Sequence, residues 1–183
     1  LEQGGAHSAG AQYVLAALAA IVLITVAFAA LGHWQRARLE KIRASAQAEG
    51  LTGDRGFMMR LAEAGVAIEA LEAIELRAMS RLSNGEAPGA ESSLTKTVGT
   101  ELSQRLTELA VEAAGAYAQP YQPHATAPGG PTPHFTPPAD GFVAGPERAW
   151  TVTAKYLNDR AGSIYAGTNE IQRNIMAKAV LGV

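Results

Sequence analysis

The sequence predicts an all-α protein, an antiparallel up-and-down four-helix bundle. Three consecutive segments carry apolar residues three or four positions apart, the period of a helix with one buried face, and short turns join them. No segment alternates apolar and polar residues over the length of a strand. The chain has 183 residues, of which 48% are hydrophobic and 17% charged, so we expect about one folded domain with a sizeable core.

The first expected helix covers residues 14–32 (VLAALAAIVLITVAFAALG), and nothing charged lies between Glu2 and Arg36. A helix of this length spans roughly 28 Å, enough to cross the hydrocarbon core of a bilayer. The segment is therefore either the first helix of the bundle or a membrane helix. We expect burial in protein, because a lone membrane span would leave the following helices short of a packing partner.

Three further helical segments follow in order. The segment from Gln35 contains strong helix formers and stops at Gly50, a natural C-terminal cap. The next helix starts near Arg55, ends at residues 83–85, and carries an apolar stripe of Phe57, Leu61, Ala64, Ile68, Leu71, Ile74, Ala78 and Leu82. A third helix ends at about Gly115, and its stripe consists of Leu94, Val98, Leu102, Leu106 and Leu109.

Residues 118–146 interrupt the helical pattern, because they contain nearly all of the prolines. We expect an ordered surface loop or a linker here. His124 and His134 are expected to be solvated, since no acidic residue or third histidine is spaced with them as a metal ligand. A short helix is then expected from about Glu147 to Arg160, and a last helix over 169–181.

Composition excludes several kinds of site. The formal net charge of −2 gives no electrostatic reason to expect nucleic acid. The chain has no cysteine, so disulfides and thiolate chemistry are excluded, and a reducing compartment such as the cytoplasm fits. Walker and GxGxxG motifs are absent from the sequence.

Two charged groupings are expected to be structural. Glu69, Glu72 and Glu75 share a helix flank but lack the Glu-x-x-His partner of a di-iron bundle, so we expect a solvated face. Glu101 and Arg105 are spaced as an i, i+4 ion pair, which stabilises a helix and carries no chemistry.

The stretch GSIYAGTNEIQRN, residues 162–174, joins the last two expected helices and is here called the joint. Gly162 and Gly167 loosen its backbone, and Thr168 or Asn169 is expected to cap the last helix. The first N–H groups of a helix have no intrahelical partner. A helix start that follows small residues is therefore a candidate site for a phosphate or another polar ligand.

Residues 156–183, YLNDRAGSIYAGTNEIQRNIMAKAVLGV, strongly resemble the C-terminal end of acyl-CoA dehydrogenases. These flavoenzymes of fatty acid metabolism use FAD to oxidise acyl-CoA thioesters at the α,β carbons. The resemblance extends upstream to cover residues 35–183, the C-terminal helical domain of the family, whereas residues 1–34 match poorly. The Ala-Tyr-Ala-Gln-Pro-Tyr turn and the proline-rich loop are most similar to a bacterial subgroup that includes pimeloyl-CoA dehydrogenase subunits.

The resemblance implies roles for residues of the joint. Thr168, Asn169 and Glu170 would contact FAD at the start of the last helix. The backbone of Gly167 would meet the substrate thioester, where a side chain would obstruct, and Tyr165 would lie beside the acyl-CoA site.

Ala166 stands where many members of the family carry the catalytic glutamate. That base removes the α-proton while hydride leaves the β-carbon for the flavin, and a methyl group cannot accept a proton. Other members place the base on the first helix of this domain, which corresponds to residues 14–32. No acid lies between Glu2 and Glu40, so we assign no catalytic residue.

The resemblance also implies that the chain does not work alone. Complete members have two more domains before this bundle, and Arg55 and Arg60 are poor substitutes for the family's Arg-x-x-Phe-Gly loop. We expect a fragment or a short subunit that needs a partner. The family implies an acyl-CoA substrate, an electron-transferring flavoprotein, and a homo- or hetero-oligomer built as a dimer of dimers. The alternatives are a non-catalytic partner or assembly subunit and a membrane-anchored helical protein.

Overall fold

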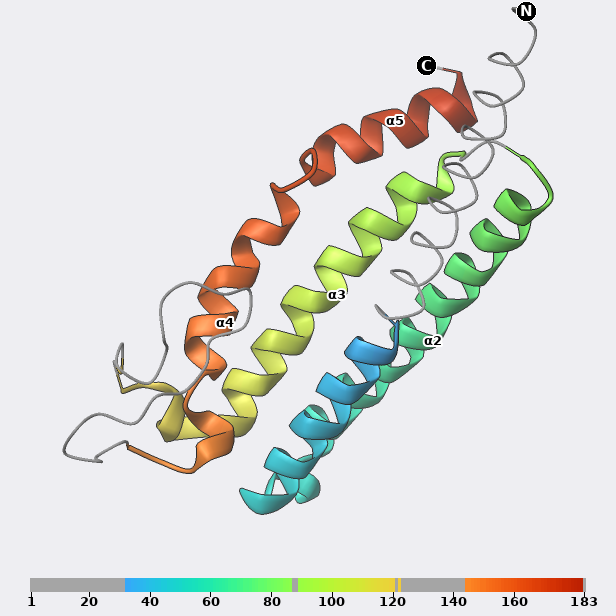
Figure 1. Cartoon of the computed structure of the whole chain (residues 1–183). Coiled ribbons are helices and arrows are strands. Elements are labelled where there is room, and N and C mark those ends of the chain that lie inside the picture. The colour runs from blue at the N-terminus through green and yellow to red at the C-terminus, as the bar shows by residue number, and fades with distance from the viewer. Residues whose placement is uncertain (1–31, 87–88, 121, 123–143, 183) are drawn as a thin grey trace, which may run out of the picture.

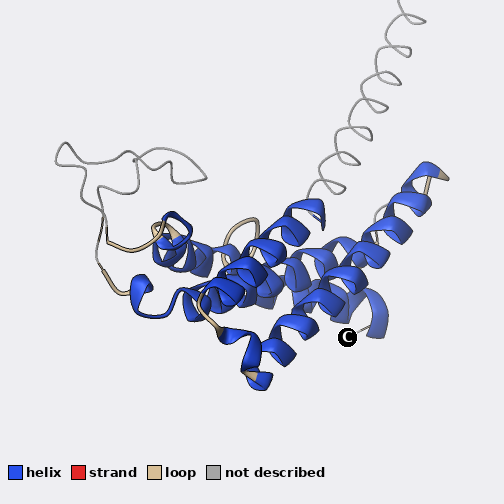
Figure 2. Ribbon diagram, turned by 90° about the horizontal axis from the view of Figure 1, so that it is seen from below, coloured by secondary structure: helices blue, strands red, loops and turns tan. Residues whose placement is uncertain are grey.

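A computed structural model describes residues 32–86, 89–120, 122 and 144–182. All regular structure in these residues is helical and none is strand, which confirms the predicted fold class (Figure 2). The predictions for residues 14–31 and for the centre of the proline-rich loop lie outside the described residues. Among the helices that are described, none combines the length and hydropathy of a membrane span.

The described chain opens with a helix over residues 32–48. The elements after it are η1 (Leu51–Gly53), α2 (Arg55–Ser83), α3 (Glu91–Ala114), η2 (Gly115–Ala118), η4 (Glu147–Ala149), α4 (Val152–Asp159), η5 (Arg160–Ser163) and α5 (Asn169–Leu181). Helix 32–48 and α3 run in the same direction, α2 runs the opposite way, and α4 and α5 follow each other along the side of α3 (Figure 1). The position of the fourth helix in the bundle is therefore occupied by two shorter helices, α4 and α5.

The bounds of the long helices agree with the sequence, and their caps explain why. Asp54 accepts a hydrogen bond from the Phe57 backbone N–H at 3.0 Å and so begins α2. Gly50 lies in the left-handed region with φ 76°, where glycine ends helix 32–48 at no steric cost. The helix expected from Glu147 is instead split into η4 and α4. Thr151 separates them, because its φ of −111° and ψ of 0° lie outside the helical region.

The core lies where helix 32–48, α2 and α3 meet. Its buried apolar residues are Leu39, Ile42, Ala46, Phe57, Leu61, Ala64, Ile68, Leu71, Leu102, Leu106, Leu109 and Ala113. The predicted stripes are thus buried over the first part of α2 and the second part of α3. Their remaining members, Ile74, Ala78, Leu82, Leu94 and Val98, are only half-buried.

The prediction of one solvated acidic face on α2 is wrong for Glu75. Glu69 is exposed, and Glu72 accepts a hydrogen bond from Arg36 Nε at 2.6 Å. Glu75 is only 4% exposed, and its Oε1 has no hydrogen-bond partner among the described residues. Burial, with the nearby charge of Glu72, raises the pKa of Glu75 to about 7.

The predicted ion pair between Glu101 and Arg105 does not form either. Glu101 pairs with Arg173 of α5, and Arg105 pairs with Glu63 of α2. Each group reaches a neighbouring helix instead of its own helix. The two charges therefore link α3 to the helices on either side of it.

Candidate functional site

The joint bends the chain between η5 and α5 through two consecutive residues with positive φ. The backbone N–H groups of Ile164 and Tyr165 both donate to Ala161 O, at 2.9 and 3.1 Å, which closes the preceding turn. Ala166 then has a φ of 55° and Gly167 a φ of 85°. A residue other than glycine pays a steric cost in this region, so the backbone at Ala166 is held by its surroundings.

Gly167 is favoured by its conformation, and its missing side chain also leaves room for Gln172. A Cβ placed on it would lie 2.9 Å from Gln172 Nε2. That same amide donates to Ala166 O at 3.2 Å and so holds the backbone turn in place. A side chain at Gly167 would therefore displace the group that fixes Ala166.

Thr168 is the residue that caps α5. Its hydroxyl accepts from the Ile171 backbone N–H at 3.4 Å, and its backbone is extended, as at most helix caps. The carboxylate of Glu170 accepts from its own backbone N–H and from the Thr168 hydroxyl, and these bonds lower the pKa of Glu170. Thr168 and Glu170 thus form one polar group at the positive end of the helix.

Asn169 points into the protein and anchors α5 to α3. The side chain is 3% exposed, and its Oδ1 accepts from Lys96 Nζ at 2.7 Å and from Thr100 Oγ1 at 3.2 Å. Its Nδ2 donates to Glu101 Oε1 at 3.5 Å. The amide therefore fixes the position of the joint. A ligand at the surface would contact Thr168 and Glu170 before it reached Asn169.

The rest of the joint is open to solvent. Ile164 and Tyr165 are each 63% exposed, and Ala166 and Gly167 are also exposed. Large apolar side chains of this exposure next to accessible backbone are typical of a surface that another molecule covers.

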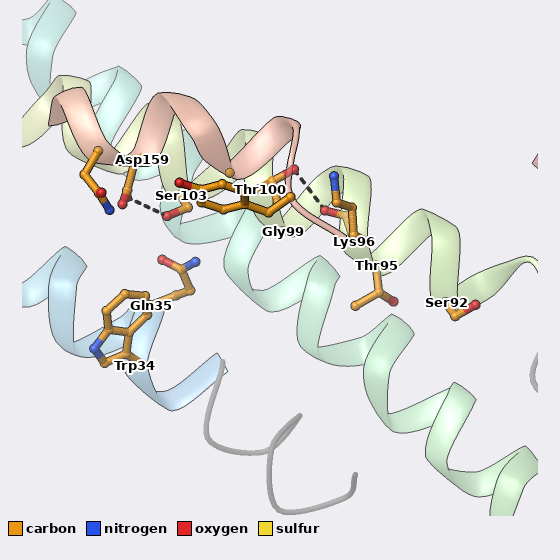
Figure 3. Close-up of a pocket in the computed structure, with 12 residues that line it drawn as sticks. Trp34, Gln35, Ser92, Thr95, Lys96, Gly99, Thr100, Ser103 and Asp159 are labelled. Carbon is orange, nitrogen blue, oxygen red and sulfur yellow. Dashed lines mark hydrogen bonds between the residues drawn. The ribbon is translucent and has the colours of Figure 1, made fainter. Parts of the chain in front are cut away.

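A groove of about 410 Å³ lies beside the joint (Figure 3). It is bounded by helix 32–48, by α3, and by the segment from α4 through the joint. Its walls are formed by Trp34, Gln35, Ser92, Thr95, Lys96, Gly99, Thr100, Ser103, Asn158, Asp159, Gly162 and Tyr165. Sequence reasoning missed this groove. The signal that could have found it is the spacing of small residues at 92, 95, 99 and 103 on one face of α3.

Trp34 forms one end of the groove and is held by two cations. Arg38 Cζ lies 4.8 Å and Lys155 Nζ 4.7 Å from the centre of its ring. Burial, followed by the nearby charge of Arg38, lowers the pKa of Lys155. Asp159 pairs with Arg38, 3.1 Å from its Nη2, and also accepts a hydrogen bond from Ser103 Oγ at 2.9 Å.

No free carboxylate stands ready as a base among the described residues of the joint and groove. Ala166 carries only a methyl group, Glu170 is bonded to the cap, and Asp159 is paired with Arg38. Within the described residues, no group of three or more His, Asp or Glu side chains is arranged to hold a metal ion. The arrangement can bind and position a ligand, and its own side chains offer no proton acceptor at Ala166.

The comparison with protein families identifies the class of protein. Residues 10–181 match the family described as acyl-CoA dehydrogenase, C-terminal domain. The match covers nearly the whole chain and includes the joint and the three segments that form the groove. The chain therefore belongs to this family.

Similar solved structures extend the comparison. The "Tcur3481-Tcur3483 steroid ACAD" is 21% identical with a TM-score of 0.64 over 87% of this chain. The "ChsE4-ChsE5 complex from Mycobacterium tuberculosis" is 25% identical with a TM-score of 0.58 over 81% of this chain. This chain spans only 36% and 35% of those two chains, so the likeness concerns the fold of one part of them. No curated protein matches the sequence.

Proposed function

We propose that the chain supplies the C-terminal helical domain of an FAD-dependent acyl-CoA dehydrogenase, which oxidises acyl-CoA thioesters at the α,β carbons. The observation that carries the proposal is the joint. Its sequence is the stretch that resembles the family, and it forms a fixed and accessible turn. Asn169 anchors it from inside, and Tyr165 and Gly167 face solvent. The joint thus presents backbone and side chains to whatever domain or subunit completes the site.

The residues of the joint fit contact with FAD. Gly167 leaves its backbone uncovered, the Thr168–Glu170 group is polar, and Ile164 and Tyr165 offer apolar surface for a flat ring. In this arrangement Thr168 and Glu170 hold the cofactor, and Asn169 holds them in place through Lys96. FAD, when bound, accepts the hydride that leaves the β-carbon of the substrate. Tyr165 and the Gly167 backbone then bound the acyl-CoA site.

A second candidate function is that of a non-catalytic partner or assembly subunit in a heteromeric acyl-CoA dehydrogenase. The observation that favours it is Ala166, because the joint is complete in every other respect and lacks only the base. General-base catalysis contributes about 10²–10⁴-fold in rate. A chain of this kind would shape a site whose proton acceptor comes from its partner.

We propose association with other chains for a further reason. The last helix, α5, exposes Ile171, Ile175, Val180 and Leu181 by 45% to 71% of their surface. Exposed apolar residues gathered on one element are typical of an interface. We propose a dimer of dimers, homomeric or heteromeric, as the assembly. We also propose that electron-transferring flavoprotein is the electron acceptor and that the protein is located in the cytoplasm. We also propose that the chain is related to the subgroup that includes pimeloyl-CoA dehydrogenase subunits, because its Gln-Pro-Tyr turn is similar to theirs.

The test is activity with and without a partner. The purified chain with added FAD is assayed by dye-linked oxidation of medium-chain and dicarboxylyl-CoA thioesters, alone and after co-expression with a full-length acyl-CoA dehydrogenase subunit. We expect no turnover and at most weak FAD binding by the chain alone, and turnover in the complex. Ala166→Glu should not restore activity to the chain alone, and Ala166→Asn serves as the control. Steady turnover by the unmodified chain alone would refute the proposal.

A further inference from the structure

Lys155 is a half-buried lysine on α4 whose ammonium has no polar partner. Its Nζ makes neither a hydrogen bond nor an ion pair within the described residues. It lies instead against the ring of Trp34, with 4.7 Å between Nζ and the ring centre. An adjacent carboxylate is what keeps most partly buried amines protonated, and Lys155 lacks one.

The carboxylate that could pair with Lys155 is directed elsewhere. Asp159 follows Lys155 by four residues on α4, a spacing at which helical side chains can form an ion pair. Its Oδ2 instead pairs with Arg38 at 3.1 Å and accepts from Ser103 Oγ at 2.9 Å (Figure 3). The charge of Asp159 is therefore largely offset by Arg38 before it acts on Lys155.

A second cation shares the ring of Trp34. Arg38 Cζ lies 4.8 Å from the centre of that ring, so Arg38 and Lys155 both lie against one side chain. The Arg38 side chain is only 11% exposed, and water screens its charge less than that of an exposed arginine. A like charge at short range disfavours the ammonium form of Lys155.

Burial acts in the same direction as the charge of Arg38. The pKa of Lys155 is lowered by desolvation first and by the Arg38 charge second, and the charge of Asp159 opposes them only in part. The ring of Trp34 attracts cations, but Lys155 shares that attraction with Arg38. A larger fraction of Lys155 than of an ordinary lysine is therefore the free amine at neutral pH.

The amine is at the border of the protein with solvent. Lys155 is only partly covered, and Trp34 beside it is 44% exposed. A lysine amine that has lost its proton is a nucleophile toward carbonyl carbons. Among carbonyl compounds, a thioester combines a reactive carbonyl with a thiolate that leaves readily.

We propose that Lys155 is a site of covalent acylation by acyl thioesters. The ammonium first loses a proton to water, and the amine nitrogen then attacks the thioester carbonyl carbon. A C–N bond forms as the C–S bond breaks, and the departing thiolate takes up the proton that the nitrogen releases. The product is a neutral amide, so one of the two positive charges at Trp34 disappears. This inference goes beyond the proposed function, because the reaction needs neither FAD nor a partner.

The first experiment compares lysines within one protein. The full chain is incubated with octanoyl-CoA at pH 7.5, and peptide mass spectrometry gives the initial rate of acylation at each lysine. We expect Lys155 to react at least about threefold faster than the exposed Lys41 and Lys178. Each unit by which a pKa is lowered gives about tenfold more free amine at this pH, and half-burial takes back part of the gain. An equal or slower rate at Lys155 would overturn the proposal.

The pH dependence separates a reactive amine from one that is only accessible. The ratio of the rate at Lys155 to that at Lys41 should fall as the pH rises from 7.5 to 10.5, because both amines lose their protons at high pH. A difference in accessibility alone would give the same ratio at every pH. A constant ratio in protein that circular dichroism shows to be folded would therefore contradict the assignment.

Two variants change the charges around Lys155 in opposite directions. Arg38→Met removes the like charge and frees Asp159 to pair with Lys155, so the rate at Lys155 should fall toward that at Lys41. Asp159→Asn removes the opposing carboxylate, so the rate at Lys155 should rise. Arg60→Met, at an exposed position of α2, is the control and should change neither rate. If neither charge variant alters the rate at Lys155 in folded protein, the cluster does not activate the amine and the proposal fails.

A small thioester separates this site from the proposed dehydrogenase function. S-acetyl-N-acetylcysteamine has no CoA moiety by which an acyl-CoA site could hold it, so the preference for Lys155 should persist with this reagent. A preference seen only with octanoyl-CoA would assign the reaction to a bound acyl-CoA, overturn the reactivity of Lys155 itself, and leave the dehydrogenase proposal intact. Failure of the activity assay would not affect these rates.

Discussion

Replacement of Glu75 by leucine is expected to stabilise the protein, and the gain should grow with pH. The Glu75 carboxyl is buried on α2, and its pKa is raised to about 7 from an ordinary value of 4.5. The folded state therefore binds a proton that the unfolded state releases between these two values. Because the folded pKa is the higher one, the stability of the wild-type protein is greatest below pH 4.5 and falls as the pH rises toward 7.

The size of the effect follows from the two pKa values. A gap of about 2.5 pH units at 1.36 kcal/mol per unit gives on the order of 3 kcal/mol. Leucine has nearly the volume of glutamate and no proton to release, so it removes this pH-dependent penalty. We expect the difference in free energy of unfolding between Glu75→Leu and wild type to increase by about 2–3 kcal/mol from pH 4.5 to pH 8.

Urea denaturation followed by circular dichroism measures this difference directly. The two proteins and the control Glu69→Leu, at an exposed position of the same helix, are compared at several values between pH 4.5 and pH 8. The control should show no comparable change with pH. If the stability curves of wild type and Glu75→Leu run parallel over this range, the carboxyl is not protonated in the folded protein and the reasoning fails.

Three further predictions concern the joint and the N-terminal segment. Ala166→Gly should stabilise the protein by about 1 kcal/mol because it relieves the positive φ, whereas Ala62→Gly in α2 should destabilise it, as thermal melting will show. Lys96→Met should increase amide hydrogen exchange of α5 about tenfold or more, because Asn169 loses a charged partner, while the exposed Lys41→Met should not. Residues 14–32 are expected to be buried in protein, and resistance of the expressed chain to carbonate extraction from membranes would contradict this.

The helices could be predicted from the sequence because their signals are local. The bounds of α2 and α5 follow from Asp54, Thr168 and the glycines, each of which acts within one turn of helix. The apolar stripes predicted the core for the same reason. The exception is the split between η4 and α4, where Thr151 leaves the helical conformation.

The contacts between helices could not be predicted in the same way. Glu75 has the same sequence spacing as Glu72, and only the packing of neighbouring helices makes one buried and the other a partner of Arg36. Asn169 was an expected ligand contact by resemblance, but its side chain is turned toward Lys96, 73 positions earlier in the chain. The groove is formed by three segments that are distant in sequence, so no single pattern identifies it.

At Ala166, the backbone conformation of the joint does not depend on the chemistry of the side chain. The turn of the joint is maintained by Gly167, by the Gln172 amide and by the anchored Asn169, and none of the hydrogen bonds that hold it uses the side chain of Ala166. A proton acceptor could thus disappear from this position, or return to it, by a single codon change without any refolding of the surrounding bundle. The left-handed backbone would admit asparagine or aspartate most readily. The side chain at this one position can therefore change while the architecture of the bundle stays constant.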